Sequence, residues 1–225
     1  MTRRLVLALG ISLPLGLAGA ADRACQPEPL RQAMEIFMSA DCARCWEQAD
    51  EAAAPGTLRL DWIVPGLQGD EAPLAVAALP EAGARLKQPL GPERGSVQRQ
   101  RLPASPGGVR LAVHSGLAWN GYIGLSFELE RGKALPADAQ GWVALVERVP
   151  AGEDNTPIAR QLVRTLVGPL PLQAAARERR VQHLRAVLLP PNSRAERLAA
   201  AGWVERADGR ILIAAQSPAA GCTAP

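Results

Sequence analysis

The chain has 225 residues, of which 48% are hydrophobic and 21% are charged, and its formal net charge is +3. This apolar content is too high for a disordered chain, and 21 glycines are too few for a collagen repeat. Aromatic residues, at 4%, offer no base-stacking surface, and the arginines are interleaved with acidic residues. We therefore expect a compact globular protein without a nucleic-acid partner.

The first twenty residues have the pattern of a secretory signal peptide. Arg3 and Arg4 precede an apolar run over residues 5–17, and residues 18–20 form a small-residue cleavage site. The apolar run is shorter than the roughly 20 residues that a membrane-spanning helix needs. We therefore expect cleavage after residue 20, a periplasmic or secreted mature protein, and no stable membrane anchor.

Four cysteines remain in the expected mature chain: Cys25, Cys42, Cys45 and Cys222. Disulfides persist in the oxidising environment that an exported protein meets, and four cysteines allow three pairings. The economical pairing is a local Cys42–Cys45 bond with a Cys25–Cys222 bond that joins the two ends of the chain. Chain ends often lie close together on a domain surface, which makes the second bond reasonable. The alternative is that the two terminal cysteines stay free.

The first part of the mature chain alternates between strand and helix patterns. Apolar runs over residues 33–39 and 58–64 predict buried strands. Between them, Asp41 can cap a helix over residues 42–54, and a further helix over 74–86 would be split by its internal proline. This order predicts a βαβ-type unit with a parallel pair of strands.

After a loop rich in proline and glycine at residues 89–108, the pattern changes to short strands. Several of these segments alternate between apolar and polar residues, and they cover residues 109–114, 122–130, 141–149, 158–167, 186–189 and 211–215. A short helix is expected over residues 194–201. The pattern is typical of an antiparallel β unit of the sandwich type. We therefore expect two domains, over residues 21–105 and 106–225.

The spacing of Cys42 and Cys45 suits disulfide exchange at the start of a helix. Unpaired backbone N–H groups there lower the pKa of the first cysteine, and the second sulfur can reach the same atom. Cys42 is thus the predicted nucleophile and Cys45 the predicted resolving thiol. Glu35, in the preceding strand, could take the proton from Cys45 as a buried carboxylate. The alternative is that Glu35 faces solvent or pairs with an arginine.

Other uses of the cysteine pair would require further ligands. Zinc needs four ligands at tight spacing, and the sequence does not offer them. Met34 and Met38 could join the two cysteines as soft ligands for copper(I), although alternating apolar residues on a strand are more typical of a core. No metal site and no cofactor are therefore predicted. The partners expected of an active pair are a redox partner protein or a thiol substrate.

The stretch that ends at the cysteine pair resembles a bacterial family of exported, thioredoxin-like proteins labelled only as a domain of unknown function. Members show a strand ending in Glu-Leu-Phe-Thr-Ser, a turn, and then Cys-Ser-Ser-Cys. The matching positions in this chain are Glu35, Phe37, Ser39, Cys42 and Cys45. Residues 152–164 and 203–215 are also similar to the family. The resemblance implies a fold of the α/β plus β class, with a thioredoxin-like N-terminal unit followed by an antiparallel β-sandwich-like domain.

Departures from the family pattern concern the surroundings of the cysteine pair. Trp46 replaces the family's proline after the second cysteine, and Asp41 replaces the glycine before the first. Only Pro103 or Pro106 could stand in for the cis-proline that faces the dithiol in thioredoxin-like folds. Two functions are therefore expected. The first is thiol–disulfide exchange through the cysteine pair, and the second is a non-enzymatic periplasmic binding or scaffold protein with a structural disulfide.

Overall fold

A computed structural model of the chain describes residues 29–48, 52–86, 89–91, 94–103, 108–130, 135–172 and 179–218. Of these residues, 50% lie in strands and 12% in helices. None of the helices in the described segments is long and apolar enough to cross a membrane. The expected signal peptide and the expected Cys25–Cys222 bond lie outside the described residues.

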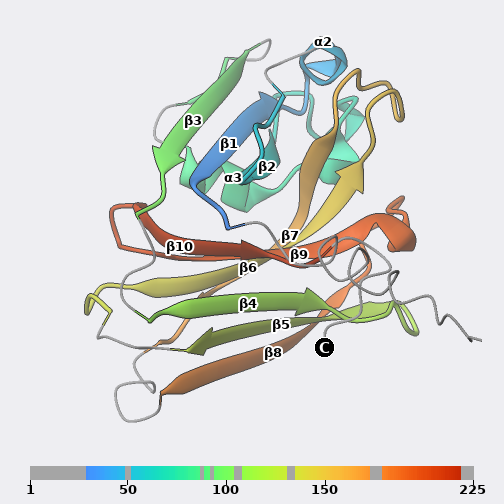
Figure 1. The fold of residues 1–225 in the computed structure, drawn as a ribbon. Coiled ribbons are helices and arrows are strands. Elements are labelled where there is room, and N and C mark those ends of the chain that lie inside the picture. The colour runs from blue at the N-terminus through green and yellow to red at the C-terminus, as the bar shows by residue number, and fades with distance from the viewer. Residues whose placement is uncertain are drawn as a thin grey trace, which may run out of the picture.

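The larger sheet has seven strands in the order β10-β9-β6-β7-β2-β1-β3 (Figure 1). In chain order, the strands are β1 (Gln32–Ser39), β2 (Thr57–Val64), β3 (Gly95–Arg101), β6 (Gln140–Val149), β7 (Arg160–Leu170), β9 (Leu198–Glu205) and β10 (Ile211–Gln216). β1 runs parallel to β2, and β2 also pairs in parallel with β7. The predicted parallel pair near the N-terminus is therefore confirmed. The other neighbours in the sheet are antiparallel.

The smaller sheet is antiparallel and has the order β4-β5-β8. Its strands are β4 (Arg110–Ser115), β5 (Tyr122–Glu130) and β8 (Arg180–Leu188). Alternate residues of β5, from Ile123 to Leu129, are buried and pack with Val143 and Leu145 of β6 in one apolar cluster. The smaller sheet therefore covers one face of the larger sheet beside β6 and β9 (Figure 1).

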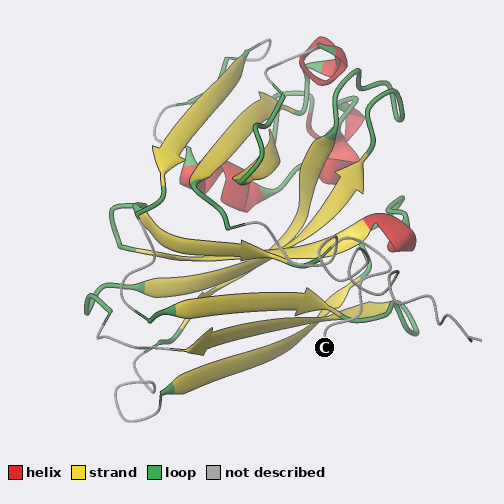
Figure 2. Cartoon of the chain, in the orientation of Figure 1, coloured by secondary structure: helices red, strands yellow, loops and turns green. Residues whose placement is uncertain are grey.

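Helices are few and short in the described chain (Figure 2). The two α-helices are α2 (Ala43–Glu47) and α3 (Pro80–Arg85), and the 3₁₀ helices are η1 (Gly69–Glu71), η2 (Ala75–Ala77) and η4 (Ala195–Arg197). Pro80 begins α3, where a proline ring fits the first helical turn. The predicted helix over residues 74–86 is therefore split into η2 and α3, as expected, but α2 ends at Glu47, well before residue 54.

The predicted fold class, a thioredoxin-like α/β unit followed by a β-sandwich-like domain, is wrong. The two α-helices have five and six residues, too few to cover the faces of a sheet. β1, β2 and β3 instead continue into β7, β6, β9 and β10 as one sheet. Two misassigned segments contribute to this difference, since residues 95–101 form β3 and residues 198–205 form β9.

β9 is a strand despite its helix-favouring alanines because a close neighbour requires small residues there. A Cβ at Gly202 would lie 2.4 Å from Cγ1 of Val113, on the smaller sheet. The run from Ala199 to Ala201 is buried on both faces of the sheet. Tertiary packing therefore overrides the local helix propensity.

The two edge strands of the larger sheet meet at one end (Figure 1). The side-chain amide of Gln100, on β3, donates to the carbonyl of Ile211 at 2.8 Å and accepts from its N–H group at 3.1 Å. The sheet therefore curls around the apolar cluster on its inner face, which includes Phe37, Trp62 and Trp203. We call this face the inner face, and the opposite face of β1 and β2 carries the cysteine pair.

Candidate functional site

The turn between β1 and α2 is fixed by Asp41. Its carboxylate accepts hydrogen bonds from the backbone N–H groups of Leu67 and Gln68, at 2.7 and 3.2 Å, in the loop after β2. A Cβ at Gly66 would lie 2.2 Å from the Asp41 carboxylate, so this close approach requires glycine. The prediction that Asp41 caps α2 is therefore wrong, because its carboxylate serves a different loop.

Cys42 and Cys45 form the predicted local disulfide, with an Sγ–Sγ distance of 2.04 Å. Cys42 is itself the N-cap of α2, and its sulfur accepts a hydrogen bond from the backbone N–H of Cys45 at 3.2 Å. The pair thus occupies the helix start that its spacing predicts. It is nevertheless buried, because Cys42 is 6% exposed and Cys45 is 7% exposed.

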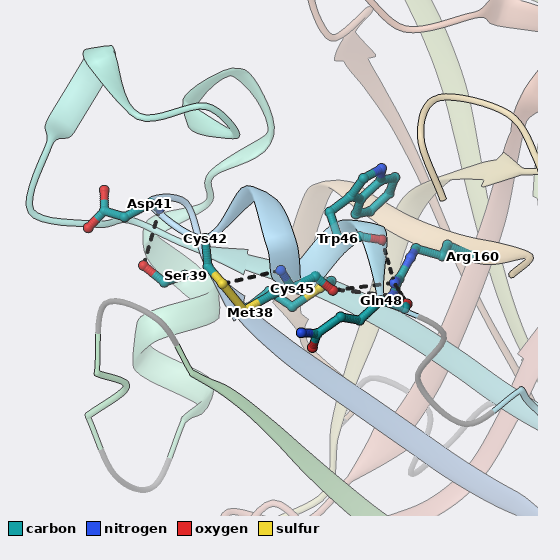
Figure 3. The surroundings of a disulfide bond; sticks show 8 residues. All are labelled: Met38, Ser39, Asp41, Cys42, Cys45, Trp46, Gln48 and Arg160. Atoms are coloured by element: carbon teal, nitrogen blue, oxygen red, sulfur yellow. Dashed lines mark hydrogen bonds between the residues drawn. A yellow bond between two sulfur atoms is a disulfide. The ribbon is translucent and has the colours of Figure 1, made fainter. Parts of the chain in front are cut away.

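An apolar cluster surrounds the disulfide, and we call it the disulfide cluster. Its members come mainly from β1, β2, α2 and the 3₁₀ region, with one residue each from β6 and β7, and they include Met34, Ile36, Met38, Ala40, Trp46 and Ile63. Figure 3 shows Met38 beside the two sulfurs. The two methionines considered as copper ligands therefore lie in the same cluster as the cysteines. No group of three or more His, Cys, Asp or Glu side chains among the described residues could hold a metal ion.

The C-terminal end of α2 is held by the buried guanidinium of Arg160, from β7 (Figure 3). Its Nη2 group donates to the carbonyl oxygens of Cys45, Trp46 and Gln48 at 3.4, 2.7 and 3.0 Å. Its carbon Cζ lies 4.9 Å from the ring centroid of Trp46. These contacts satisfy carbonyls that a short helix leaves without partners, and they fix the backbone that carries the second cysteine.

Arg160 is in turn paired with the fully buried carboxylate of Asp61, on β2. Nη1 of Arg160 donates to Asp61 at 3.3 Å, and Arg59 donates twice to the same carboxylate, both times at 2.7 Å. The backbone N–H of Gln161 adds a further hydrogen bond at 2.8 Å. This network was not among the predicted site residues. The alternation of Arg59 and Asp61 within an apolar run is the sequence signal for it, since buried charges require partners.

Glu35 is not brought together with the cysteine pair, because it lies on the inner face of the larger sheet. Its carboxylate accepts from Nε of Arg85 at 2.8 Å and from the indole N–H of Trp62 at 3.1 Å. Arg85 also bonds both oxygens of Glu205, which accepts from the indole N–H of Trp203 at 2.9 Å. The arginine-paired alternative for Glu35 is therefore the arrangement in the structure.

The guanidinium of Arg85 is enclosed by these two carboxylates and two indoles. Its Cζ lies 5.6 Å from the ring centroid of Trp62 and 5.0 Å from that of Trp203. Burial alone would lower the pKa of Arg85, but the charges and hydrogen bonds of Glu35 and Glu205 outweigh it and raise that pKa. Arg85 therefore stays charged and joins α3 to both β1 and β9.

A cavity of about 560 Å³ adjoins this cluster. It lies between β3 and the start of β10, and the side chains that line it include Glu35, Ser96, Gln98 and Arg210. This volume falls within the range of small-molecule sites, roughly 300–1,000 Å³. No local pattern in the sequence indicates this cavity, because its walls come from segments more than 100 residues apart.

The prolines considered as partners of the cysteine pair do not take that role. Pro106 lies outside the described residues, and the peptide bond before Pro103 is not cis. The cis peptide bond in the described chain precedes Pro169, in β7. Leu170, the residue after Pro169, packs in the cluster beneath the smaller sheet, whereas Cys42 belongs to the disulfide cluster. This cis peptide bond therefore belongs to a different part of the core from the cysteine pair.

Comparisons with known proteins show a related fold and no family. No protein-family model matches the chain, and no curated protein matches it either. The structure is similar to that of HBP35 of Porphyromonas gingivalis, with a TM-score of 0.51 and 12% sequence identity, over 89% of this chain and 80% of that one. At this identity the similarity concerns the fold alone. An endonuclease/exonuclease/phosphatase from Beutenbergia cavernae DSM 12333 matches with a TM-score of 0.26 and 19% identity, over 55% of this chain and 30% of that one, which supports no argument.

Proposed function

We propose that this chain is an exported, non-catalytic binding or scaffold protein in which the Cys42–Cys45 disulfide is structural. The observation that supports this proposal is the burial of both cysteines within the disulfide cluster, at 6% and 7% exposure. An exchange reaction requires an incoming thiolate to approach one sulfur in line with the bond. Apolar side chains and the α2 backbone surround the sulfurs instead.

The contacts of α2 agree with a structural role for the disulfide. Arg160 binds three carbonyls at the end of the helix, so the backbone that carries Cys45 is held by these contacts in addition to the disulfide. In the chain-entropy model, a crosslink that closes so short a loop contributes about 2 kcal/mol of stability. A five-residue helix is too short to be stable alone, so such a contribution matters to it.

Thiol–disulfide exchange is the second candidate, and one observation favours it. Cys42 is the N-cap of α2, and its sulfur accepts the backbone N–H of Cys45. The same N–H group would stabilise a thiolate at Cys42 after reduction. This candidate requires the reduced protein to expose Cys42 more than the oxidised protein does.

Differential alkylation separates the two candidates, because trypsin places each cysteine on its own peptide. Cleavage after Arg31, Arg44 and Arg59 separates Cys42 from Cys45. The folded protein is treated with dithiothreitol, alkylated with iodoacetamide for increasing times, denatured, digested and measured by mass spectrometry. A structural disulfide predicts slow labelling of both peptides in the folded protein and fast labelling in urea. Rapid labelling of Cys42 alone in the folded protein would reject the structural role.

The reduction potential gives an independent measurement on the same protein. Equilibration with glutathione redox buffers should give a potential below about −300 mV for a structural bond, whereas about −230 to −120 mV is typical of exchange proteins.

Export is part of the proposal and rests on the signal-peptide pattern at residues 1–20. N-terminal sequencing of the mature protein from a periplasmic fraction tests it, and an intact N-terminus in the cytosol would contradict it.

A further inference from the structure

The cavity beside β3 has a negatively charged inner end. Glu35 and Glu205 share the single guanidinium of Arg85, so these three groups together carry a net charge of −1. Glu35 lines the cavity, and its side chain is 12% exposed. A buried charge is screened less than an exposed one, so the excess negative charge acts on whatever occupies this end.

Glu35 also has unused hydrogen-bonding capacity. Oε1 accepts from Trp62 and from Arg85, and Oε2 accepts from Arg85 at 3.2 Å. An ionised carboxylate offers about four acceptor positions, so one position on Oε2 is not used by these three bonds. The group with spare acceptor capacity is therefore the one that lines the cavity.

Neutral polar side chains on β3 stand next to this carboxylate. Gln98 lies directly opposite Glu35 in the antiparallel register, and Ser96 lies opposite Phe37, on the same face. Directly opposed residues place their Cβ atoms about 4.5–5.5 Å apart, so the amide oxygen of Gln98 can reach the same bound group as the Glu35 carboxylate. Both β3 side chains are half-buried and line the cavity.

The positive charges that line the cavity belong to its exposed part. Arg99 and Arg210 are exposed, and the exposed Asp208 offsets one of them. Charges in contact with solvent are screened more than buried ones. The inner end at Glu35 therefore favours a cation, and a carboxylate together with an amide oxygen is a matched acceptor set for an ammonium group.

We propose that this cavity binds a small organic amine, whose ammonium group is held by the carboxylate of Glu35 and the amide oxygen of Gln98. The inference deepens the proposed binding function and names its ligand class. Its failure is distinguishable from failure of the structural-disulfide proposal, because the alkylation assay reads the cysteines and the binding assay reads the opposite face of β1.

The indole N–H of Trp62 is a reporter for the test, because it donates to the same carboxylate. Butylamine is titrated into the oxidised, ¹⁵N-labelled full chain, and the indole signals are followed by NMR after assignment with Trp→Phe variants. Butanol and butyrate are the neutral and anionic probes of equal chain length. We expect a saturable shift of the Trp62 signal with butylamine alone, and little change at Trp119, which is 83% exposed.

Substitutions on β3 test the same site without removing the bonds of Glu35 to Arg85. Gln98→Lys supplies a competing ammonium within the cavity and should weaken butylamine binding at least tenfold. Val97→Lys is the matched control, because Val97 lies on the other face of β3 and is 43% exposed, so binding should be retained. Equal shifts with all three probes, no shift with butylamine, or unchanged binding in Gln98→Lys would each overturn the proposal.

Discussion

Replacing Arg160 by methionine should destabilise the protein strongly, because this guanidinium joins α2 to β2. The substitution keeps an unbranched side chain but removes the hydrogen bonds that Arg160 donates to Asp61, to Thr156 and to the carbonyls at the end of α2. Breaking a buried ion pair by removing one partner typically costs about 3–5 kcal/mol. Asp61 retains its bonds from Arg59 and from the Gln161 N–H group, so we expect the lower end, about 3 kcal/mol.

Urea denaturation measures this loss as a change in the midpoint. With an m value of about 2 kcal/mol/M, a loss of about 3 kcal/mol lowers the midpoint by roughly 1.5 M. Arg194→Met is the matched control, because the Arg194 side chain is 49% exposed and its ion pairs with Glu153 and Asp154 should be worth less than about 1 kcal/mol. Dithiothreitol should also reduce the disulfide faster in Arg160→Met. Equal midpoints for the two variants, at unchanged m, would refute the role given to Arg160.

Two further predictions concern sheet packing and pH. Gly202→Ala should cost about 1–3 kcal/mol, because the added Cβ meets Cγ1 of Val113 at 2.4 Å, whereas Gly124→Ala, whose Cβ meets no atom within 4 Å, should be nearly neutral in the same urea assay. Equal stability of these two variants would contradict the packing argument. The hydrogen bond from Arg206 lowers the pKa of Asp138 below its ordinary value of 3.8, so Asp138 stabilises the fold above that pH and the contribution is lost as the pH falls through the lower, folded-state pKa. The midpoint difference between wild type and Asp138→Asn should therefore disappear in acid, and a difference independent of pH would contradict this sign.

The parts of the fold that the sequence predicts are those with a strong local pattern. β1 and β2 follow from their apolar runs, and β5 follows from strict alternation, since its buried residues recur at every second position. The Cys42–Cys45 bond follows from the spacing, because two cysteines with only two residues between them lie close together whatever the rest of the fold is. Each of these features is determined within about ten residues of sequence.

The parts that the sequence does not predict depend on distant partners. β3 is rich in glutamine and arginine and carries no apolar stripe, because one of its faces lines a polar cavity. Arg85 lies 50 residues from Glu35 and 120 from Glu205, so nothing in its local sequence indicates either ion pair. The pattern of a strand, a turn and two spaced cysteines over residues 34–45 is local, whereas the arrangement of the remaining strands is set by packing that twelve residues do not contain.

The contact between Gln100 and Ile211 has a consequence for association between molecules. Exposed edge strands can recruit a strand from another copy of the chain, which is a common route to aggregation. A single amide here imitates a peptide group and occupies both the donor and the acceptor of Ile211 on the outermost strand. A side chain of one edge strand thereby covers backbone groups at the start of the other edge strand, which a strand from a second molecule would otherwise find unpaired.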